Sequence, residues 1–432
     1  MNSKTEYIAA IDVGTSFTVG IAGKKTNEGK MEVIALASTP SEGVKRGVVV
    51  NIEEAAAGIK RVSDQLFAEA QMGFDAVFAG IAGQHIRSFQ NHCSKYIDRS
   101  ENEITRDDVE DLHADMFKQK IGPGETIIHV IPQSFTVDQE PDVKNPVGMA
   151  GKKLEADYHI LVGQETSVQN IEKCINRAGL ELVDLIFEPL AASEAVLSED
   201  EKEAGVALID FGGGTTDLIV YYDGVIRHTA VIPFGGQVIA TDIKEGCSIL
   251  QRQAETLKVK FGSALGDLAD ENKVVSIPGI TGRKPKEISF RNIAHIIQAR
   301  MEEILDAVLL EIEKSGVADK LGAGIVITGG GAQLMHLPEL INWKTGYDVR
   351  MGTPDLSQIQ TEVKGLGNPR YATALGLMLK GFKNPHSGRI KPLLAKEKEP
   401  MEEEEVKPAK RGLFREWAKK ITNILETPAH ES

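Results

Sequence analysis

The sequence predicts an α/β protein built from two related halves. Short runs rich in β-branched residues, at 7–13 and 205–210, each lead into a glycine-containing turn and a second apolar run, the pattern of a β-hairpin. The two hairpins carry Asp, Gly and Thr at their tips and begin at Asp12 and Asp210, 198 residues apart (210 minus 12). Because such self-similarity indicates an internal repeat, we expect one duplicated α/β half-molecule.

The composition excludes several classes of protein. At 41% hydrophobic and 26% charged residues, a chain of 432 residues can bury a sizeable core, in roughly two to four compact units. A net charge of −14 argues against a nucleic-acid coat. The three cysteines are far apart and form no CxxC pair, which argues against a disulfide framework or a cysteine zinc site and fits a reducing compartment. Neither a signal peptide nor an apolar run of about 20 residues is present.

Both hairpin tips have the chemistry of phosphate binding. Glycines let the backbone approach an anion, and adjacent N–H groups and hydroxyls donate hydrogen bonds to it. Asp12 and Asp210 would repel bare phosphate, so we expect a divalent cation between them. The alternative is two ordinary turns, where the same residue types are common. The candidate phosphate-binding residues are Gly14, Thr15, Ser16, Gly212, Gly213, Gly214 and Thr215.

A third glycine cluster follows an apolar strand at 324–328. It comprises Gly329, Gly330 and Gly331, and a helix is expected over 332–340. Strand, glycines and helix together bring backbone N–H groups close to a phosphate or sugar. The combination of three clusters favours a nucleotide site over independent turns.

The remaining segments differ in character. An inserted subdomain of mixed α and β structure is expected from about residue 85, and helical periodicity predicts helices over 164–178, 189–197 and 291–314. From 384 to 410 the chain has four prolines and a dense charge run, which is typical of a flexible linker.

The last segment, 411–427, predicts an amphipathic helix. On a helical wheel its large apolar residues share an arc of roughly 120°, flanked by basic residues, a composition typical of a helix in a membrane interface. A helix docked on the protein's own body or in a partner's groove is the alternative, and the charged linker argues against docking on the body. The candidate membrane-contacting residues are Leu413, Phe414, Arg415, Trp417, Lys419, Lys420, Ile421, Ile424 and Leu425.

The ordered motifs resemble those of the actin and sugar-kinase ATPase superfamily. AIDVGTSFT and LIDFGGGTTDL look like its two phosphate motifs, and IVITGGGAQL is similar to its adenosine motif. EPLAAS at 188–193 and PRYATALG at 369–376 look like the two connecting helices, and ETLK at 255–258 resembles the ribose-contacting helix. The resemblance implies a two-lobed actin-like fold with ATP and Mg²⁺ in the cleft between the lobes.

Roles follow from this resemblance residue by residue. Asp12 and Asp210 would organise the Mg²⁺ shell and act in catalysis, and Glu188 would orient an attacking water. The alternative for Glu188 is a carboxylate that stabilises a helix N-terminus. The adenosine would be contacted by Gly329, Gly330 and Gly331, and the ribose by Glu255 and Lys258.

An actin-type ATPase with an amphipathic tail resembles the FtsA family of bacterial cell-division proteins. The resemblance implies an inserted subdomain called 1C in place of the usual second subdomain of the first lobe. The expected division is 1–84, 162–200 and 359–383 for the first-lobe core (1A), 85–161 for 1C, 201–235 and 317–358 for the second-lobe core (2A), 236–316 for its small subdomain (2B), 384–410 for the linker and 411–427 for the membrane-targeting helix.

The family resemblance also implies partners. The chain would polymerise on the cytoplasmic face of the membrane at the septum and tether the tubulin-like FtsZ ring, whose C-terminal peptide would bind subdomain 2B near Arg300. The alternative for Arg300 is a solvated helix charge. Further expected partners are a second copy of the chain in a filament, an anionic membrane surface and, through 1C, other division proteins, but no nucleic acid.

The sequence offers no counterpart of the catalytic lysine that large heat-shock chaperone ATPases carry on the subdomain absent here. We therefore expect weak ATPase activity at most, with ATP serving mainly to close the cleft. The alternatives are a small-molecule kinase of the same superfamily and an FtsA-like scaffold of another membrane machine, such as a pilus-assembly platform.

Overall fold

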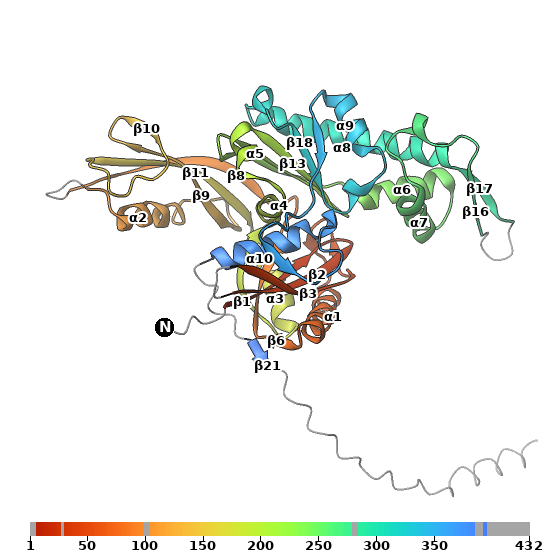
Figure 1. The fold of residues 1–432 in the computed structure, drawn as a ribbon, viewed down its shortest axis with the longest axis horizontal. Coiled ribbons are helices and arrows are strands. Elements are labelled where there is room, and N and C mark those ends of the chain that lie inside the picture. Colours follow the sequence, from red (N-terminus) through yellow and green to blue (C-terminus); the bar gives the residue numbers. More distant parts are fainter. Residues whose placement is uncertain (1–5, 27–29, 99–102, 279–283, 385–391, 395–432) are drawn as a thin grey trace, which may run out of the picture. The chain divides into compact units, whose positions relative to one another are not determined.

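A computed structural model describes residues 6–26, 30–98, 103–278, 284–384 and 392–394 of the chain. The chain divides into one compact unit of residues 1–393 and a second unit of residues 394–432. The expected membrane-targeting helix at 411–427 and all but a few residues of the expected linker lie outside the described residues. The elements described below belong to the first unit, apart from the last residue of a short terminal strand (Figure 1).

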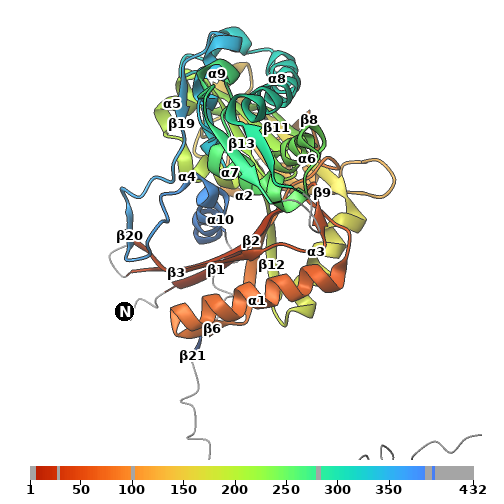
Figure 2. The same cartoon turned by 90° about the vertical axis from the view of Figure 1, so that its right-hand side faces the viewer.

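The first lobe is built on a six-stranded sheet with the order β12-β7-β1-β2-β3-β20. Strands β1, β2 and β3 form an antiparallel meander, whereas β7 and β12 run parallel to β1. Helices α1 (Ile52–Ala70) and α10 (Ala372–Lys383) cover opposite faces of this sheet (Figure 2). The strands span β1 (Glu6–Val13), β2 (Phe17–Lys25), β3 (Met31–Pro40), β7 (Ala76–Ile81), β12 (Glu181–Phe187) and β20 (Ile359–Thr361).

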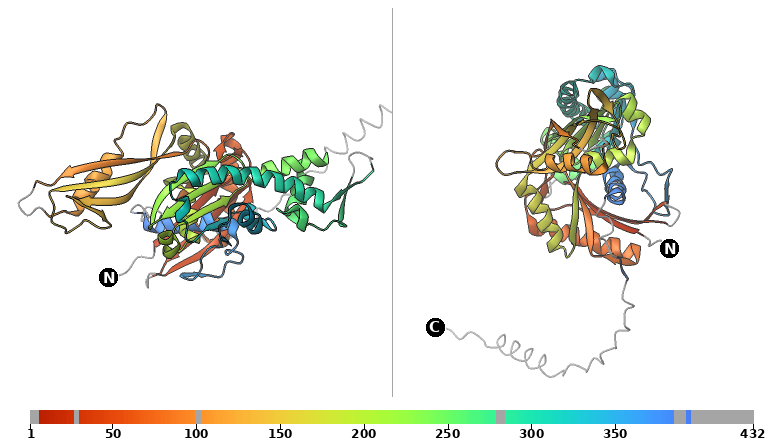
Figure 3. Two further views of the ribbon diagram at one scale, coloured as in Figure 1. Left: turned by 90° about the horizontal axis from the view of Figure 1, so that it is seen from above. Right: turned by 90° about the vertical axis from the view of Figure 1, so that its left-hand side faces the viewer.

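The second lobe repeats the meander in a five-stranded sheet with the order β15-β14-β13-β18-β19. Helix α8 (Phe290–Lys314) lies along one face of this sheet, as the view from above shows (Figure 3). Helix α9 (Leu337–Thr345) connects β18 to β19. The strands span β13 (Val206–Phe211), β14 (Thr216–Tyr222), β15 (Val225–Ile232), β18 (Ile325–Thr328) and β19 (Val349–Met351).

An inserted sheet with the order β10-β9-β11-β8 leaves the first lobe after β7 and returns at helix α3 (Glu165–Arg177). It has its own core, in which Leu154, Tyr158 and Ile160 pack on helix α2 (Arg106–Met116). The strands span β8 (Arg87–Tyr96), β9 (Glu125–Val137), β10 (Glu140–Val143) and β11 (Lys153–Gln164).

Smaller elements complete the second lobe and the connections. Helices α6 (Gly236–Cys247) and α7 (Gln251–Phe261) pack against α8, beside the hairpin β16 (Val274–Ile277) and β17 (Lys286–Ser289). Helix α5 (Glu199–Ala204) precedes β13. Short strands occur at β4 (Val44–Lys45), β5 (Val48–Val49), β6 (Met72–Phe74) and β21 (Pro392–Leu394).

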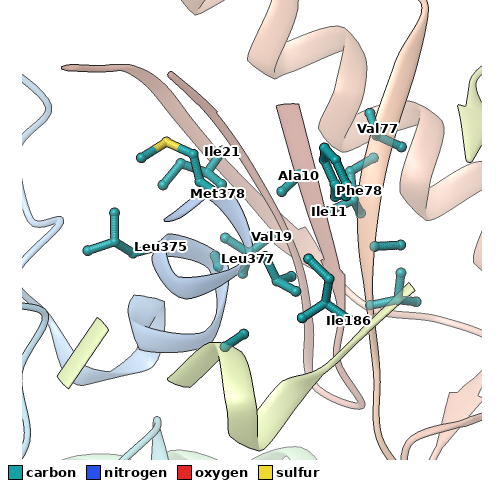
Figure 4. Packing of buried hydrophobic residues seen from close by; sticks show 14 of the residues in the cluster. Ala10, Ile11, Val19, Ile21, Val77, Phe78, Ile186, Leu375, Leu377 and Met378 are labelled. Carbon is teal, nitrogen blue, oxygen red and sulfur yellow. The ribbon is translucent and has the colours of Figure 1, made fainter. Parts of the chain in front are cut away.

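Two helices connect the lobes, and small residues let them cross closely. Helix α4 (Glu188–Val196) packs on α10, and a methyl group added to Gly376 of α10 would overlap the Ala191 carbonyl of α4. The glycine costs helix propensity but permits the approach. On its other side α10 places Leu375, Leu377 and Met378 in the first-lobe core, near Val19 and Ile21 (Figure 4).

The predicted two-lobed α/β fold, both hairpins and the helices at α3, α4 and α8 are confirmed. The helix expected over 332–340 is wrong in its start. A single 3₁₀ turn at Gly331–Gln333 follows the glycines, and α9 begins only at Leu337. Pro338 sits in the first turn of α9, where its missing N–H does no harm, and it could not lie inside a longer helix. No described helix is long and apolar enough to cross a membrane.

Candidate functional site

The two predicted hairpins have the same register. In the first, Asp12 pairs with Val19 and Val13 with Thr18. In the second, the equivalent partners are Asp210 with Asp217 and Phe211 with Thr216. Each therefore turns through a four-residue loop, 14–17 in the first lobe and 212–215 in the second.

The two loops touch each other across the lobes. A methyl group added to Gly213 would overlap the Ser16 hydroxyl, and one added to Gly214 would overlap that of Thr15. Thr15 Oγ1 also accepts a hydrogen bond from the Gly47 N–H at 3.0 Å, which fixes the β4–β5 turn against the loops. All candidate phosphate-binding residues are thus brought together.

The two predicted metal-binding carboxylates lie at the base of these loops. Burial, followed by repulsion from Asp210, raises the pKa of Asp12 from 3.8 to about 7. Burial raises the pKa of Asp210 to about 6, against the effect of a 2.9 Å hydrogen bond that Thr373 Oγ1 donates to it. Both groups therefore resist ionisation while no cation compensates them.

Glu188 joins the same cluster from the first residue of α4. Its pKa is raised well above the ordinary value, mainly by burial and then by Asp12, Asp217 and Asp210. A methyl group on Gly80 of β7 would lie 2.9 Å from Glu188 Oε1, so the carboxyl group rests directly on that glycine. This placement puts Glu188 beside Asp12, Asp217 and Asp210.

Asp217 is a member of the cluster that the sequence interpretation missed. Its pKa is raised well above the ordinary value by burial first and by Asp210 second. Oδ2 accepts a 3.1 Å hydrogen bond from Thr215 Oγ1, while Oδ1 is buried with no hydrogen-bond partner. The register could have revealed it, because Asp217 lies opposite Asp210, but the first hairpin has Val19 there and the repeat gave no cue.

The cluster fits Mg²⁺ held together with phosphate. Among the described residues, no lysine or arginine forms an ion pair with these four carboxylates: Asp12, Glu188, Asp210 and Asp217. In the same part of the chain, no group of three or more His, Cys, Asp or Glu could hold a metal by itself. Mg²⁺ is commonly bound by one or two carboxylates, water and substrate phosphates, which matches an acidic cluster beside glycine loops.

The third glycine cluster lies next to the second hairpin. Strands β13 and β18 are parallel neighbours, and Asp210 pairs with Thr328. Gly329 has a φ of 87°, and a methyl group there would overlap Asp210 Oδ1. A methyl group on Gly331 would lie 2.9 Å from the Phe211 carbonyl oxygen. The predicted adenosine-contacting glycines are therefore adjacent to the phosphate loop.

The predicted ribose-contacting residues sit on α7 and reach the same loop. Lys258 Nζ donates to the Gly236 carbonyl at 2.6 Å and pairs with Glu255 at 2.9 Å. Gly236, the first residue of α6, donates its N–H to the Gly212 carbonyl. Lys258 thereby links α7 to the start of α6 and to the second phosphate loop.

Arg370 is a second residue that the sequence interpretation missed. Its guanidinium lies over the Phe17 ring at 4.2 Å, and its Cβ lies 4.0 Å from a methyl group built on Gly330. Nη2 is buried without a hydrogen-bond partner. Arg370 thus stands between the first phosphate loop and the third glycine cluster, a position that no local motif indicates.

The predicted partner-binding residue, Arg300, belongs to a separate set of contacts. Arg300 on α8 bonds to Asp242 of α6 at 2.6 and 3.1 Å and pairs with Glu303, and its side chain is 25% exposed. It therefore already has two carboxylate partners. The predicted membrane-contacting residues, Leu413 to Leu425, lie outside the described residues.

Comparisons with known proteins agree with this arrangement. The sequence profile of the family described as "Cell division protein FtsA" matches residues 207–376, and that of the "SHS2 domain inserted in FTSA" matches residues 83–162. The FtsA of Pseudomonas aeruginosa is 37% identical over 383 residues, covering 89% of this chain and 91% of its own length. The FtsA of Escherichia coli K12 is 33% identical over 394 residues, covering 89% and 92%.

Solved structures with the same fold are more distant in sequence. The PilM–PilN type IV pilus biogenesis complex has a TM-score of 0.62 at 17% identity, covering 86% of this chain and 98% of that chain. MreB5 of Spiroplasma citri bound to ADP has a TM-score of 0.52 at 15% identity, covering 88% and 99%. These similarities confirm the predicted actin-like fold.

Proposed function

Because the chain belongs to the FtsA family of bacterial cell-division proteins, we propose that it is an ATP-binding scaffold of the division septum. In this proposal it polymerises on the cytoplasmic face of the cell membrane and tethers the FtsZ ring. The observation that carries the nucleotide part is the convergence of two glycine loops and four carboxylates, including Asp12 and Asp210, at one place.

The loops supply the donors for a triphosphate. Backbone N–H groups at 14–16 and 213–215 and the hydroxyls of Thr15 and Ser16 would bind the phosphates. The Gly212 N–H already donates to the Thr215 carbonyl, and the Thr215 hydroxyl would have to turn from Asp217 to a phosphate oxygen. Asp12 and Asp210 would hold Mg²⁺, which supplies positive charge to the phosphate oxygens. Gly329, Gly330 and Gly331 would face the adenosine, with Glu255 and Lys258 near the ribose.

Glu188 would orient a water for hydrolysis, which requires the ionised carboxylate. Its raised pKa means that burial and the neighbouring carboxylates oppose ionisation until a cation offsets the cluster. Within the described residues no lysine or arginine is paired with the cluster. We therefore propose slow hydrolysis, with nucleotide binding mainly favouring the closed cleft and the polymer.

The experiment for the nucleotide site is MgATP binding to the full chain. We expect one nucleotide per chain, bound far more weakly when Mg²⁺ is chelated. A Ser198→Ala variant in the loop before α5 serves as a matched control, because Ser198 only caps that helix. A folded wild-type chain that takes up no nucleotide would refute the site.

Membrane attachment is assigned to the segment 411–427 from its sequence. Trp417→Glu places a charge in the apolar arc, whereas Thr422→Glu places the same charge outside that arc. We expect the wild type and Thr422→Glu to sediment with anionic vesicles and Trp417→Glu to remain in solution. Equal sedimentation of both variants would remove the anchor assignment.

Binding of the FtsZ C-terminal peptide is assigned to the small subdomain at 236–316. Arg300→Ala is expected to weaken binding of that peptide, whereas Lys314→Ala, at the far end of the same helix, is expected to leave it unchanged. Since Arg300 is engaged by Asp242, circular dichroism must show that α6 and α8 remain folded. A peptide that binds both variants as it binds the wild type would shift the contact to another surface.

The division into subdomains is part of the same proposal. The boundaries are 1–84, 162–200 and 359–383 for 1A, 85–161 for 1C, 201–235 and 317–358 for 2A, and 236–316 for 2B. The profile match at 83–162 and the separate core of the inserted sheet support the 1C boundaries. Other division proteins would bind through this subdomain.

A further inference from the structure

The inserted sheet reaches the start of the connecting helix α4. His129 lies on β9, and its Nε2 accepts a hydrogen bond from the Phe187 N–H at 3.0 Å. Phe187 is the last residue of β12 and occupies the N-cap position of α4. The next residue is Glu188. The imidazole of His129, which belongs to the inserted subdomain, therefore holds the backbone of the residue that immediately precedes Glu188.

Besides this bond, Phe187 is held by its pairing with Ile81 of β7 and by the burial of its side chain in the first-lobe core. Phe187 has no polar side chain with which to cap α4, and no side-chain cap bond is made. Helix N-termini leave N–H groups without intrahelical partners, so the start of a helix depends on contacts from outside it. On the far side, Glu188 rests against Gly80, so a shift of Phe187 moves the carboxyl group relative to the loops.

The imidazole is in the right protonation state to accept this bond. Burial lowers the pKa of His129 from 6.5 to about 4, with Lys380 adding to the effect and Asp184 opposing it. At neutral pH the ring is uncharged, and because Nε2 accepts, the proton is on Nδ1. The bond is therefore formed throughout the physiological range.

The position of His129 is set by the inserted sheet. It pairs with Leu161 in the register of β9 and β11, and those strands continue into the separate core of that sheet. A displacement of the sheet, for example when a protein binds to it, would be passed to Phe187 through the imidazole. Glu188 would then move away from or toward its productive position.

We propose that His129 is a positioning residue for Glu188, through which the inserted subdomain sets the rate of ATP hydrolysis. The proposal rests on the proposed role of Glu188 in the ATP site. It predicts a change in turnover with little change in nucleotide affinity, because the phosphate loops 14–17 and 212–215 do not contact His129.

Two substitutions that differ by one methylene group test the bond. In His129→Gln the side-chain oxygen reaches the place of Nε2, whereas in His129→Asn it falls short of the Phe187 N–H. We expect single-turnover hydrolysis of MgATP by the full chain to fall about tenfold to a hundredfold in His129→Asn and to be largely retained in His129→Gln. In both variants the MgATP affinity is expected to stay within about twofold of the wild-type value, because the substitutions change the position of Glu188 and not the groups that bind the nucleotide.

Amide hydrogen exchange gives a direct readout of the bond. Exchange of the Phe187 amide is expected to rise about tenfold in His129→Asn and to stay near the wild-type rate in His129→Gln. His159→Asn is the matched control, because His159 is another buried histidine of the same sheet but faces Thr229 Oγ1 of β15, at 3.3 Å. This control is expected to leave both measurements unchanged.

The outcomes distinguish the positioning role of His129 from the proposed role of Glu188. Equal turnover in His129→Asn and the wild type, or equal losses in His129→Asn and His159→Asn, would overturn the positioning role. A wild-type chain that binds MgATP but never hydrolyses it would instead refute the role of Glu188. Unchanged Phe187 exchange in His129→Asn would also overturn the proposal, whatever the turnover.

Discussion

The hairpins β1–β2 and β13–β14 have the same register and loop length, but their loops differ in the side chains that they carry. The first loop carries the side chains of Thr15, Ser16 and Phe17, whereas the second carries Gly212, Gly213 and Gly214. Where the loops meet, the hydroxyls of the first occupy the space left by the missing side chains of the second. At this contact the first loop therefore supplies hydroxyl groups, and the second loop supplies the space that they occupy.

A second difference lies at the base of the hairpins. Val19 stands opposite Asp12, whereas Asp217 stands opposite Asp210. The second hairpin therefore contributes two carboxylates and the first contributes one. Because Glu188 of α4 joins Asp12 on the side of the first lobe, each lobe supplies two of the four carboxylates.

The largest expected effect comes from filling the space in the second loop. Gly213→Ala places a methyl group where the Ser16 hydroxyl lies, so the loops must separate. We expect MgATP affinity to fall at least a hundredfold, about 2.7 kcal/mol. The measurement is a nucleotide titration of the full chain.

A compensating substitution in the first loop sharpens this prediction. Ser16→Gly removes the obstructing hydroxyl and should restore part of the affinity in the double variant, a coupling that a double-mutant cycle measures. Gly58→Ala, on α1, has room for the methyl group and is the benign control. An additive result in the cycle would show that the loops do not meet as described.

The next effect concerns the carboxylate that only the second hairpin has. Asp217→Asn keeps an acceptor for the Thr215 hydroxyl but removes a buried, poorly compensated carboxyl group. In the nucleotide-free chain we expect the free energy of unfolding at pH 8 to rise by about 1–3 kcal/mol. Chemical denaturation checks this, and a loss of stability at pH 8 would contradict it.

The pH dependence of stability follows from Asp12 and Asp210. Their pKa values are about 7 and 6 in the folded chain against an ordinary 3.8, so the folded state holds protons more tightly than the unfolded state. Their contribution to stability is complete below about pH 3.8 and is lost as the pH rises through 6 to 7. We expect the nucleotide-free melting temperature to fall between pH 5 and pH 8.

A variant of Asp12 tests whether the two carboxyl groups of Asp12 and Asp210 cause the fall in melting temperature. Asp12→Asn cannot ionise and should show a shallower fall over the same range. Saturating MgATP should also reduce the fall, because the bound cation favours the ionised carboxylates. A wild-type melting temperature that rises steadily from pH 5 to pH 8 would contradict the raised pKa values.

The smallest effect concerns a single hydrogen bond of the first loop. Thr15→Ala removes the acceptor for the Gly47 N–H and should lower the free energy of unfolding by about 1 kcal/mol. Urea denaturation without nucleotide measures it. Thr26→Ala, at an exposed turn, is the comparison and should cost less.

Local patterns were sufficient to predict the hairpins and the order of the motifs. Alternation of apolar residues and glycine turns predicts strands directly, and the recurrence of Asp, Gly and Thr predicts that the two loops are related. These features depend on neighbours in the chain. Pro338 also gave local information. A proline is tolerated in the first turn of a helix, so it indicates that the helix after the third glycine cluster starts near residue 337 and not at 332.

The residues missed by the sequence interpretation depend on contacts that are remote in the chain. His129 acts on a backbone amide 58 positions away, and a backbone amide has no sequence signature. The guanidinium of Arg370 lies over the ring of Phe17, a residue more than 350 positions away in the chain. Asp217 lies in the second phosphate motif, LIDFGGGTTDL. Its burial and its raised pKa, however, depend on the fold, which places Asp210 and Asp12 beside it.

The central claim is that the two hairpins together bind one metal-bound nucleotide. Its most direct test is a calorimetric titration of MgATP at pH 6.5, repeated in buffers of different ionisation enthalpy. Asp12 and Asp210 are partly protonated at that pH in the free chain, so binding should release protons. We expect proton release for the wild type, and a smaller release and weaker binding for both Asp12→Asn and Asp210→Asn. Tight binding without proton release that neither substitution alters, or no binding by the folded wild type, would contradict it.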